Sequence, residues 1–423
     1  MNSVGDTHSP HRAITLLALV AAGEAAFFLP FLVARVFRPT VLEVFNLTNL
    51  QLGTAYGVYG AVAMAAYLLG GPLADRFAAR NMLVIALVTT ALGGLVLFAV
   101  PTLTMLITLY AWWGVTTIAL LWAPLIRATR EWGGDDAQGT AFGLLDGGRG
   151  LLAAITASIL VMVFAGLLPV DPNLASLDER TDALKQVILM LFAITLATAV
   201  LTWFVLPAGR SDNQQRVKKP RIALHDIQHV FAMPTVWLQA LIVLCAYVGF
   251  RSIDDFALYA NEVLGMNEAE SAQVGTVSLW IRPIAAVAAG LLADRLGTVR
   301  MTLVSFILLA TGSSVLASGI MLQGTALLFM LIVITTSLGI FALRGLYFAI
   351  MREGKVPLAV TGTAVGFVSV IGYTPDVFMG PLMGWLLDRS PGAPGHQDLF
   401  ALVTTVALLG IVATVLFQRA TQR

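Results

Sequence analysis

Two short charged segments, each between two long apolar runs, constrain this chain more than any other feature. They read Gly71-Pro-Leu-Ala-Asp75-Arg76-Phe-Ala-Ala-Arg80 and Gly290-Leu-Leu-Ala-Asp294-Arg295-Leu-Gly297-Thr-Val-Arg300. In both, a glycine precedes an Asp-Arg pair by four residues and a further arginine follows. This pattern is typical of a tight turn between membrane-spanning helices. Asp294 lies 219 positions after Asp75, about half of the chain, so the repeat indicates a duplicated membrane protein.

The composition favours a lipid environment. Of the 423 residues 58% are hydrophobic and only 12% are charged, whereas a soluble protein has about 25% charged residues. A helix needs about 20 apolar residues to cross the bilayer core. Twelve such runs are present, at 13–36, 48–74, 81–100, 103–130, 137–168, 183–206, 234–260, 268–293, 300–320, 325–351, 357–387 and 398–418. We therefore predict an all-α integral membrane protein with 12 transmembrane helices.

The duplication divides the predicted helices into two pseudo-symmetric halves of six. Gln51-Leu-Gly53-Thr54 matches Gln273-Val-Gly275-Thr276, and Gly139-Thr-Ala-Phe-Gly143 matches Gly362-Thr-Ala-Val-Gly366, at nearly the offset of the charged turns. We expect an amino-terminal half at 1–208, a basic cytoplasmic linker at 209–232 and a carboxy-terminal half at 233–423. Equal offsets along the chain favour parallel halves related by an axis along the membrane normal.

Basic residues predict the orientation, because cytoplasmic loops are enriched in lysine and arginine. If the amino terminus is cytoplasmic, the even-numbered connections and the tail hold most of them: Arg76, Arg80, Arg130, Arg210, Arg216, Lys218, Lys219, Arg221, Arg295, Arg300, Arg352, Lys355, Arg419 and Arg423. The opposite side holds Arg35, Arg38, Arg180, Lys185 and Arg389. We expect both termini on the cytoplasmic side of a bacterial inner (plasma) membrane.

The repeated turns resemble the loop signature of the major facilitator superfamily, which lies between helices 2 and 3 and recurs between helices 8 and 9. The second copy keeps the glycine of this signature at Gly297, whereas the first has Ala78. The resemblance implies the superfamily fold and a secondary transporter. We expect the turns to control conformational gating through eight residues: Gly71, Asp75, Arg76, Arg80, Gly290, Asp294, Arg295 and Arg300.

Ionisable residues inside the predicted spans are candidates for the transport site, since each costs about 2.5–3.5 kcal/mol at the centre of a spanning helix. They are Glu24, Asp146, Arg149, Arg251, Asp254, Asp255, Arg282, Arg344 and Asp376. Predicted helices 3, 6, 9 and 12 carry none well inside their spans. These four helices are therefore suited to lipid contact, and the other eight are expected to line a polar cavity.

The intramembrane arginines are the expected substrate contacts. Arg149 lies one helical turn from Asp146, and Arg251 lies one turn from Asp254 and Asp255, so both can instead form structural ion pairs. Arg282 and Arg344 have no acid one turn away. Aromatic residues that can hydrogen-bond a ligand join the candidate site, although each can equally pack or anchor a helix at the interface: Tyr56, Trp122, Trp280 and Tyr373.

Three acids are candidates for proton coupling. Glu24 lies near the middle of its predicted span and is the leading candidate, with Asp376 second and Asp146 third. A structural pair between Glu24 and an arginine is an equally good interpretation.

We expect a permease that moves a small organic anion by alternating access, as a symporter or antiporter that protons can drive. The alternatives are a proton symporter for a neutral or cationic solute and a membrane sensor that retains a transporter fold. An enzyme is not expected, because the five histidines fall in polar segments and no P-loop is present. We expect a monomer in the lipid bilayer with no cofactor, no metal and no nucleic acid partner. The single cysteine, Cys245, is expected to pack in an apolar run.

Overall fold

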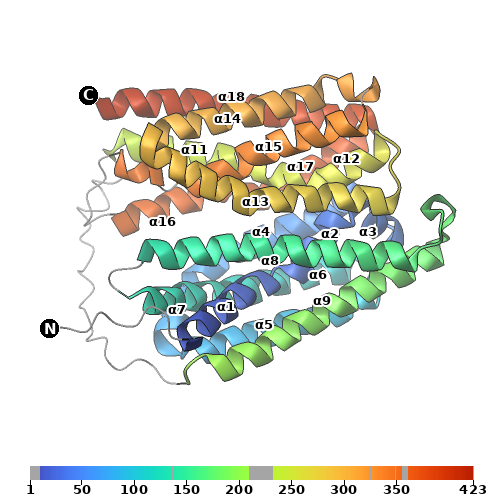
Figure 1. The fold of residues 1–423 in the computed structure, drawn as a ribbon, viewed down its shortest axis with the longest axis horizontal. Coiled ribbons are helices and arrows are strands. Elements are labelled where there is room, and N and C mark those ends of the chain that lie inside the picture. The colour runs from blue at the N-terminus through green and yellow to red at the C-terminus, as the bar shows by residue number, and fades with distance from the viewer. Residues whose placement is uncertain are drawn as a thin grey trace. The chain divides into compact units, whose positions relative to one another are not determined.

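The structure is a computed structural model that describes residues 10–134, 138–208, 232–323, 325–347, 349–354 and 361–422. The elements in these ranges are helices (Figure 1). Among the described residues, 11 helices are long and apolar enough to cross a membrane, or 12 if one bent pair counts as a single span. The predicted count of 12 therefore depends on the first span.

Contacts divide the chain into two compact units, Met1–Ala34 with Ala61–Asn213, and Arg35–Gly60 with Gln214–Arg423. This division differs from the predicted one because 35–60 groups with the second unit. α2 (Val33–Val36) and α4 (Asn49–Arg76) each contribute to both units. The first unit otherwise contains α1 (Pro10–Ala25), η1 (Phe28–Leu32), α5 (Ala79–Phe98), α6 (Leu103–Gly114), η2 (Val115–Trp122), α7 (Ala123–Gly133), α8 (Gln138–Leu167), η3 (Pro172–Leu174) and α9 (Leu177–Val205).

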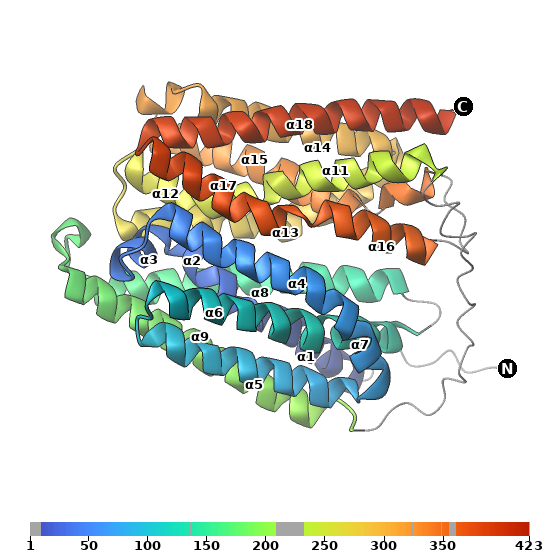
Figure 2. The same ribbon diagram turned by 180° about the vertical axis from the view of Figure 1, so that it is seen from behind.

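The second unit contains the remaining described helices. These are α3 (Arg38–Val44), α11 (Pro234–Arg251), η4 (Ser252–Asp255), α12 (Phe256–Glu262), α13 (Glu268–Leu296), α14 (Thr298–Ala317), η5 (Ile320–Gln323), α15 (Ala326–Leu346), η6 (Ala349–Arg352), α16 (Thr361–Gly372), α17 (Pro375–Arg389) and α18 (Ala393–Gln422). Within this unit α11 and α14 pack along α18 (Figures 1 and 2). Its buried aromatic core includes Phe306, Phe329, Phe400 and Phe417.

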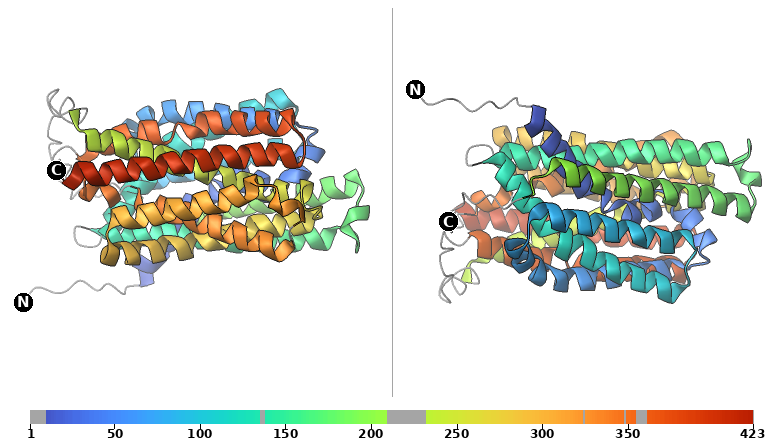
Figure 3. Two further views of the ribbon diagram at one scale, coloured as in Figure 1. Left: turned by 90° about the horizontal axis from the view of Figure 1, so that it is seen from above. Right: turned by 90° about the horizontal axis from the view of Figure 1, so that it is seen from below.

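Two helices of the first unit are irregular near the middle of their spans. α1 ends at Ala25, and the π-helical turn η1 follows with a bend of 40° between Arg12–Ala25 and Phe28–Val36. Pro30 lies in η1, where its missing N–H and its ring disfavour a regular α-helix. α6 and α7 are joined through the π-helical segment η2 into one span, Leu103–Gly133. Such π-helical segments are often found at functional sites. Figure 3 shows the helices of each unit from two further directions.

Glycines on the first part of α4 allow a close backbone approach to α17 within the second unit. A Cβ on Gly53 would clash with the carbonyl oxygen of Gly380, and a Cβ on Gly60 would clash with the backbone of Asp376. The carboxylate of Asp388, near the end of α17, accepts hydrogen bonds from the backbone N–H groups of Asn49 and Leu50 at 3.0 and 2.8 Å. Asn49 and Leu50 are the first two residues of α4. Asp388 of α17 therefore caps the amino-terminal end of α4.

Candidate functional site

Four arginines and two aspartates gather with aromatic residues in the second unit, in what we call the arginine–tyrosine cluster. Its members are Arg35, Arg38, Tyr56, Tyr247, Phe250, Arg251, Asp254, Arg344, Tyr347, Tyr373 and Asp376. They come from both ends of the sequence because 35–60 packs with the carboxy-terminal helices.

Asp254 is the central acid of this cluster. Its Oδ1 accepts a hydrogen bond from Arg35 Nε at 2.6 Å, and its Oδ2 lies 3.3 Å from Arg251 Nη1. Arg38 donates from Nη1 to the backbone oxygen of Asp254 at 3.2 Å and from Nη2 to Asn49 Oδ1 at 2.9 Å. All four residues of the Asp254–arginine group are buried. Because a buried charge needs a partner, Asp254 and its arginines hold η4 in place.

The other acid, Asp376, is bound by a phenol. Tyr247 donates its hydroxyl hydrogen to Asp376 Oδ2 at 3.0 Å, while Asp376 Oδ1 lies 3.7 Å from Arg251 Nε. The hydroxyl oxygens of Tyr347 and Tyr373 are 3.3 Å apart, and the rings of Tyr247 and Tyr373 lie 5.0 Å apart. One tyrosine hydroxyl therefore binds the carboxylate, and a ring contact connects this tyrosine to the pair formed by Tyr347 and Tyr373.

Arg344 of α15 joins this cluster through ring contacts. Its guanidinium carbon lies 3.9 Å from the ring centroid of Phe250 and 5.9 Å from that of Tyr247. Stacking on a ring face supports the guanidinium plane while its N–H groups point outward from the edge. The side chain is only half-buried. This arrangement suits an arginine that binds an anion with two parallel hydrogen bonds.

A second cluster lies in the first unit around Arg149 of α8. Its Nε lies 3.0 Å from Glu24 Oε2 and donates to the backbone oxygen of Gly23 at 3.1 Å, whereas Asp146 Oδ1 is 3.9 Å from Arg149 Nη1. The guanidinium also lies over the rings of Phe27 and Trp122, at 5.6 and 5.4 Å. The π-helical segment η1 begins directly after Phe27, and η2 ends at Trp122. We call these residues the Arg149 cluster.

Most of the residues predicted for substrate binding and proton coupling fall into these two clusters. Tyr56, Arg251, Arg344, Tyr373 and Asp376 belong to the arginine–tyrosine cluster, and Glu24, Trp122, Asp146 and Arg149 belong to the Arg149 cluster. Arg282 and Trp280 lie on α13, outside both clusters as defined, with Trp280 38% exposed. The role of each residue in substrate binding or proton coupling stays a prediction.

Sequence reasoning missed Arg35 and Arg38 as site residues, because it assigned them to the outer side of the membrane. They are 9% and 2% exposed, because α2 and α3 fold them against Asp254. It also missed Tyr247 and Phe250, which lie four and one residues before Arg251 in the same helix. The spacing of four residues puts Tyr247 and Arg251 on one helix face, and this could have identified Tyr247 from the sequence.

Two further expectations need correction. Asp255 was a candidate partner of Arg251, but its Oδ2 lies 2.7 Å from Nδ1 of His396. His396 was assigned to a polar segment, but it is fully buried in the first turn of α18. This helix begins at Ala393, before the apolar run that predicted it, and so takes His396 into the packed interior.

The two charged turns differ in backbone conformation. Gly297 has φ of +93°, a region that L side chains rarely adopt, whereas Ala78 is extended with φ of −66°. The glycine found only in the second copy therefore has a steric reason. Among the described residues, no atom would lie within 4 Å of a Cβ on Gly71 or Gly290. The charged pairs Asp75-Arg76 and Asp294-Arg295 and also Arg300 are exposed.

The first turn is braced by neighbouring helices of its own unit. Arg127 of α7 donates to the backbone oxygen of Ala74 at 2.7 Å and pairs with Glu131 at 2.8 Å. Arg80 lies 4.3 Å from the ring centroid of Trp203. In the second unit, Glu353 Oε1 accepts from the backbone N–H of Thr298 at 2.6 Å, at the start of α14. Gating by these turns stays a prediction.

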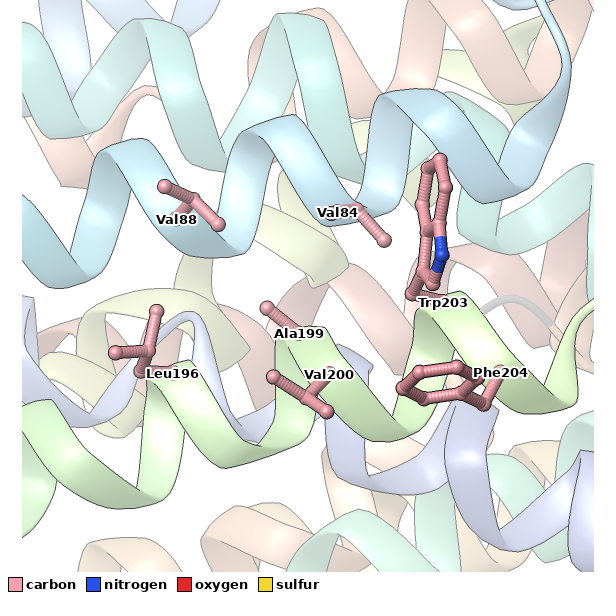
Figure 4. Close-up of a pocket in the computed structure, with 7 residues that line it drawn as sticks. All are labelled: Val84, Val88, Leu196, Ala199, Val200, Trp203 and Phe204. Atoms are coloured by element: carbon pink, nitrogen blue, oxygen red, sulfur yellow. The ribbon is translucent and has the colours of Figure 1, made fainter.

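A crevice between α5 and α9 does not have the chemistry of a polar transport site (Figure 4). It has a volume of about 170 Å³ and is lined by Val84, Val88, Leu196, Ala199, Val200, Trp203 and Phe204. These helices correspond to predicted helices 3 and 6, which were expected to face lipid. Exposed apolar side chains such as Ile85 and Phe204 fit that expectation.

Sequence comparison relates this chain to a family of membrane transporters. A family model described as "Major Facilitator Superfamily" matches residues 14–374. Inner membrane protein YqcE of Escherichia coli (strain K12) is 27% identical over 97% of this chain and 95% of its own. The nitrate/nitrite transporter NarU of Salmonella typhimurium is 25% identical over 64% of this chain and 62% of its own.

A solved structure has the same fold. It is a bacterial homologue of the human lysosomal transporter Spinster in an inward-facing, unoccupied conformation, with a TM-score of 0.74 and 15% identity over 98% of each chain. The predicted all-α membrane fold is confirmed, and so is the expected location as an integral inner membrane protein.

Proposed function

Because the chain belongs to the major facilitator superfamily and is a secondary transporter for a small solute, not an enzyme, we propose that its solute is a small organic anion. Alternating access would carry this anion across the inner membrane, with Arg344 as its main charged contact. The main support for an anionic solute is the arginine–tyrosine cluster, which has four arginines and only two carboxylates.

The roles of the four arginines follow from their contacts. Arg35, Arg38 and Arg251 contact Asp254 within 3.3 Å and brace η4. Arg344 stacks on Phe250 at 3.9 Å, lies 5.9 Å from the ring centroid of Tyr247 and is half-buried. An arginine fork with phenol donors matches a carboxylate, sulfonate or phosphate ester. The surrounding rings can bury the apolar part of an organic anion.

The relative NarU provides separate support, since its name states that it transports the anions nitrate and nitrite. At 25% identity over 64% of the chain, this similarity supports an anionic class of solute and no particular compound. Arg282, with Trp280, remains a candidate second contact on α13.

We propose that protons drive transport through Glu24 of the Arg149 cluster. Glu24 pairs with Arg149 at 3.0 Å, so a proton on Glu24 would remove the negative charge that faces the guanidinium. Asp376 and Asp146 are the next candidates; Asp146 is the more accessible, with a side chain that is 52% exposed. We further propose two six-helix halves joined by a cytoplasmic linker at 209–232, with both termini in the cytoplasm. In this proposal the two charged turns control gating, and the protein is a monomer.

Uptake into proteoliposomes tests the solute class. The panel contains labelled carboxylates, sulfonates and phosphate esters, with neutral sugars and amines of similar size, each measured with and without a pH gradient. We expect uptake of at least one class of anion, lost in Arg344→Gln and retained in Arg419→Lys, a control on the exposed end of α18. Uptake of sugars or amines alone would support the neutral or cationic alternative. Binding without uptake would support a sensor.

A further inference from the structure

His396 lies between two acids in the second unit. Its Nδ1 is 2.7 Å from Asp255 Oδ2, and its Nε2 is 3.2 Å from Glu262 Oε2. His396 and Asp255 are fully buried, whereas the side chain of Glu262 is 31% exposed. Three elements, α18, η4 and α12, therefore meet at one imidazole ring, which the proposed function does not use.

The positions of the ring nitrogens constrain the proton count. A neutral imidazole donates from one nitrogen and accepts at the other, whereas an imidazolium donates from both. Ionised carboxylates only accept. A neutral ring between two ionised carboxylates would direct one nitrogen lone pair at a carboxylate oxygen, which is repulsive. Hydrogen bonds at both ring nitrogens therefore require one more proton than is present in a neutral histidine with two ionised carboxylates.

The geometry points to a proton-binding site formed by His396, Asp255 and Glu262, separate from Glu24 and Asp376. The bound proton makes the ring an imidazolium that joins α18 to η4 and α12 through two charge-assisted hydrogen bonds. Binding takes one proton from water and release returns it, with no other bond formed or broken. Glu262, as the exposed member, is the point of exchange with solvent.

The other titratable groups near the His396 ring do not form ion pairs with it in the described part of the chain. Tyr259 of α12 presents its ring at 5.1 Å from the imidazole and directs its hydroxyl to the backbone oxygen of Leu316 at 3.4 Å. Asp398, two residues along α18, is exposed. The helices α11, α14 and α17 also pack on α18. Within the described residues, His396 forms its ion pairs with Asp255 and Glu262.

The position of η4 connects this site to the arginine–tyrosine cluster. Asp255 pairs with His396, and its neighbour Asp254 pairs with Arg35 and Arg251. Loss of the proton would leave Asp255 as a buried charge without a cation, which strongly favours movement of η4. Movement of η4 would shift Asp254 against its arginines. This link rests on the proposed function, whereas the proton site itself does not.

Nitrogen NMR of the full-length protein in lipid nanodiscs, labelled with ¹⁵N-histidine, tests the site without any solute. The chain has five histidines, and His396→Gln identifies the resonance. We expect both ring nitrogens of His396 to be protonated at about pH 7, where an ordinary imidazole is largely neutral. Glu262→Gln should make the ring lose its proton at a lower pH, and Asp398→Asn should leave it unchanged.

Two results would overturn the inference. A neutral His396 ring at about pH 7 would contradict the bound proton, and an unchanged titration in Glu262→Gln would exclude the second acid from the site. For the link to the cluster, the pH profile of solute uptake in His396→Gln decides. We expect it to differ from that of the parent; an identical profile would refute the link while leaving the NMR result intact.

Discussion

Asp254 and Asp255 are consecutive residues whose carboxylates bind different partners: Asp254 accepts from Arg35 at 2.6 Å, and Asp255 lies 2.7 Å from His396. They occupy η4, a single 3₁₀ turn between α11 and α12. A break of this kind lets neighbouring side chains point to different groups, which a continuous α-helix would not favour. The turn thus carries both the buried arginine group and the buried histidine.

Replacing Asp254 with Asn should destabilise the protein. The change leaves Arg35 and Arg251 buried without their shared carboxylate, and breaking a buried pair costs about 3–5 kcal/mol. Thermal unfolding in detergent measures the loss, with the exposed Asp398→Asn as the matched control. Equal melting temperatures for the two variants would show that Asp254 does not hold this group together.

The pair of Glu24 and Arg149 should behave as an interacting unit. Glu24→Gln and Arg149→Gln should each lower stability, since each leaves a buried partner, while the double variant should lose less than the sum. A double-mutant cycle on thermal unfolding gives the interaction energy. For coupling, Glu24→Gln should no longer accumulate solute in response to a pH gradient. If it does, the proton carrier is another acid.

The close approach of α4 and α17 should not tolerate a side chain. Gly53→Ala would place a methyl group against the backbone of Gly380, and overpacking of this kind costs about 1–3 kcal/mol. Gly166→Ala in α8 is the control, because no described atom lies within 4 Å of its Cβ and alanine is the better helix former. Similar stability for both variants would argue against tight packing at Gly53.

Labelling of introduced cysteines tests the orientation. The native Cys245 is buried, so it should react little with a membrane-impermeant thiol reagent. A cysteine at Ser176, which is exposed at the start of α9, should react in intact cells. One at Ser211, in the predicted cytoplasmic linker, should react only after the cells are opened. The opposite pattern would reverse the assigned topology.

The fold could be predicted from the sequence because a shortage of charge and a repeated turn leave few alternatives. Local pairs could also be predicted: Arg251 and Asp254 are one turn apart and lie 3.3 Å from each other. Contacts between distant segments could not. The partner of Arg149 at 3.0 Å is Glu24 on another helix, 125 positions earlier, and Arg35 and Arg38 are buried only because α2 and α3 fold onto the carboxy-terminal helices.

The most direct test of an anion held by Arg344 is the affinity of the transported solute for Arg344→Lys, measured by competition in proteoliposomes. Lysine keeps the charge but loses the planar fork. We expect affinity to fall by about 1.5–3 kcal/mol, typical of a hydrogen bond to a charged group, or roughly tenfold or more. Arg282→Lys, measured in parallel, tests the second candidate contact. If Arg344→Lys and Arg344→Gln both bind and transport like the parent, Arg344 does not hold the solute and the proposed anion site is wrong.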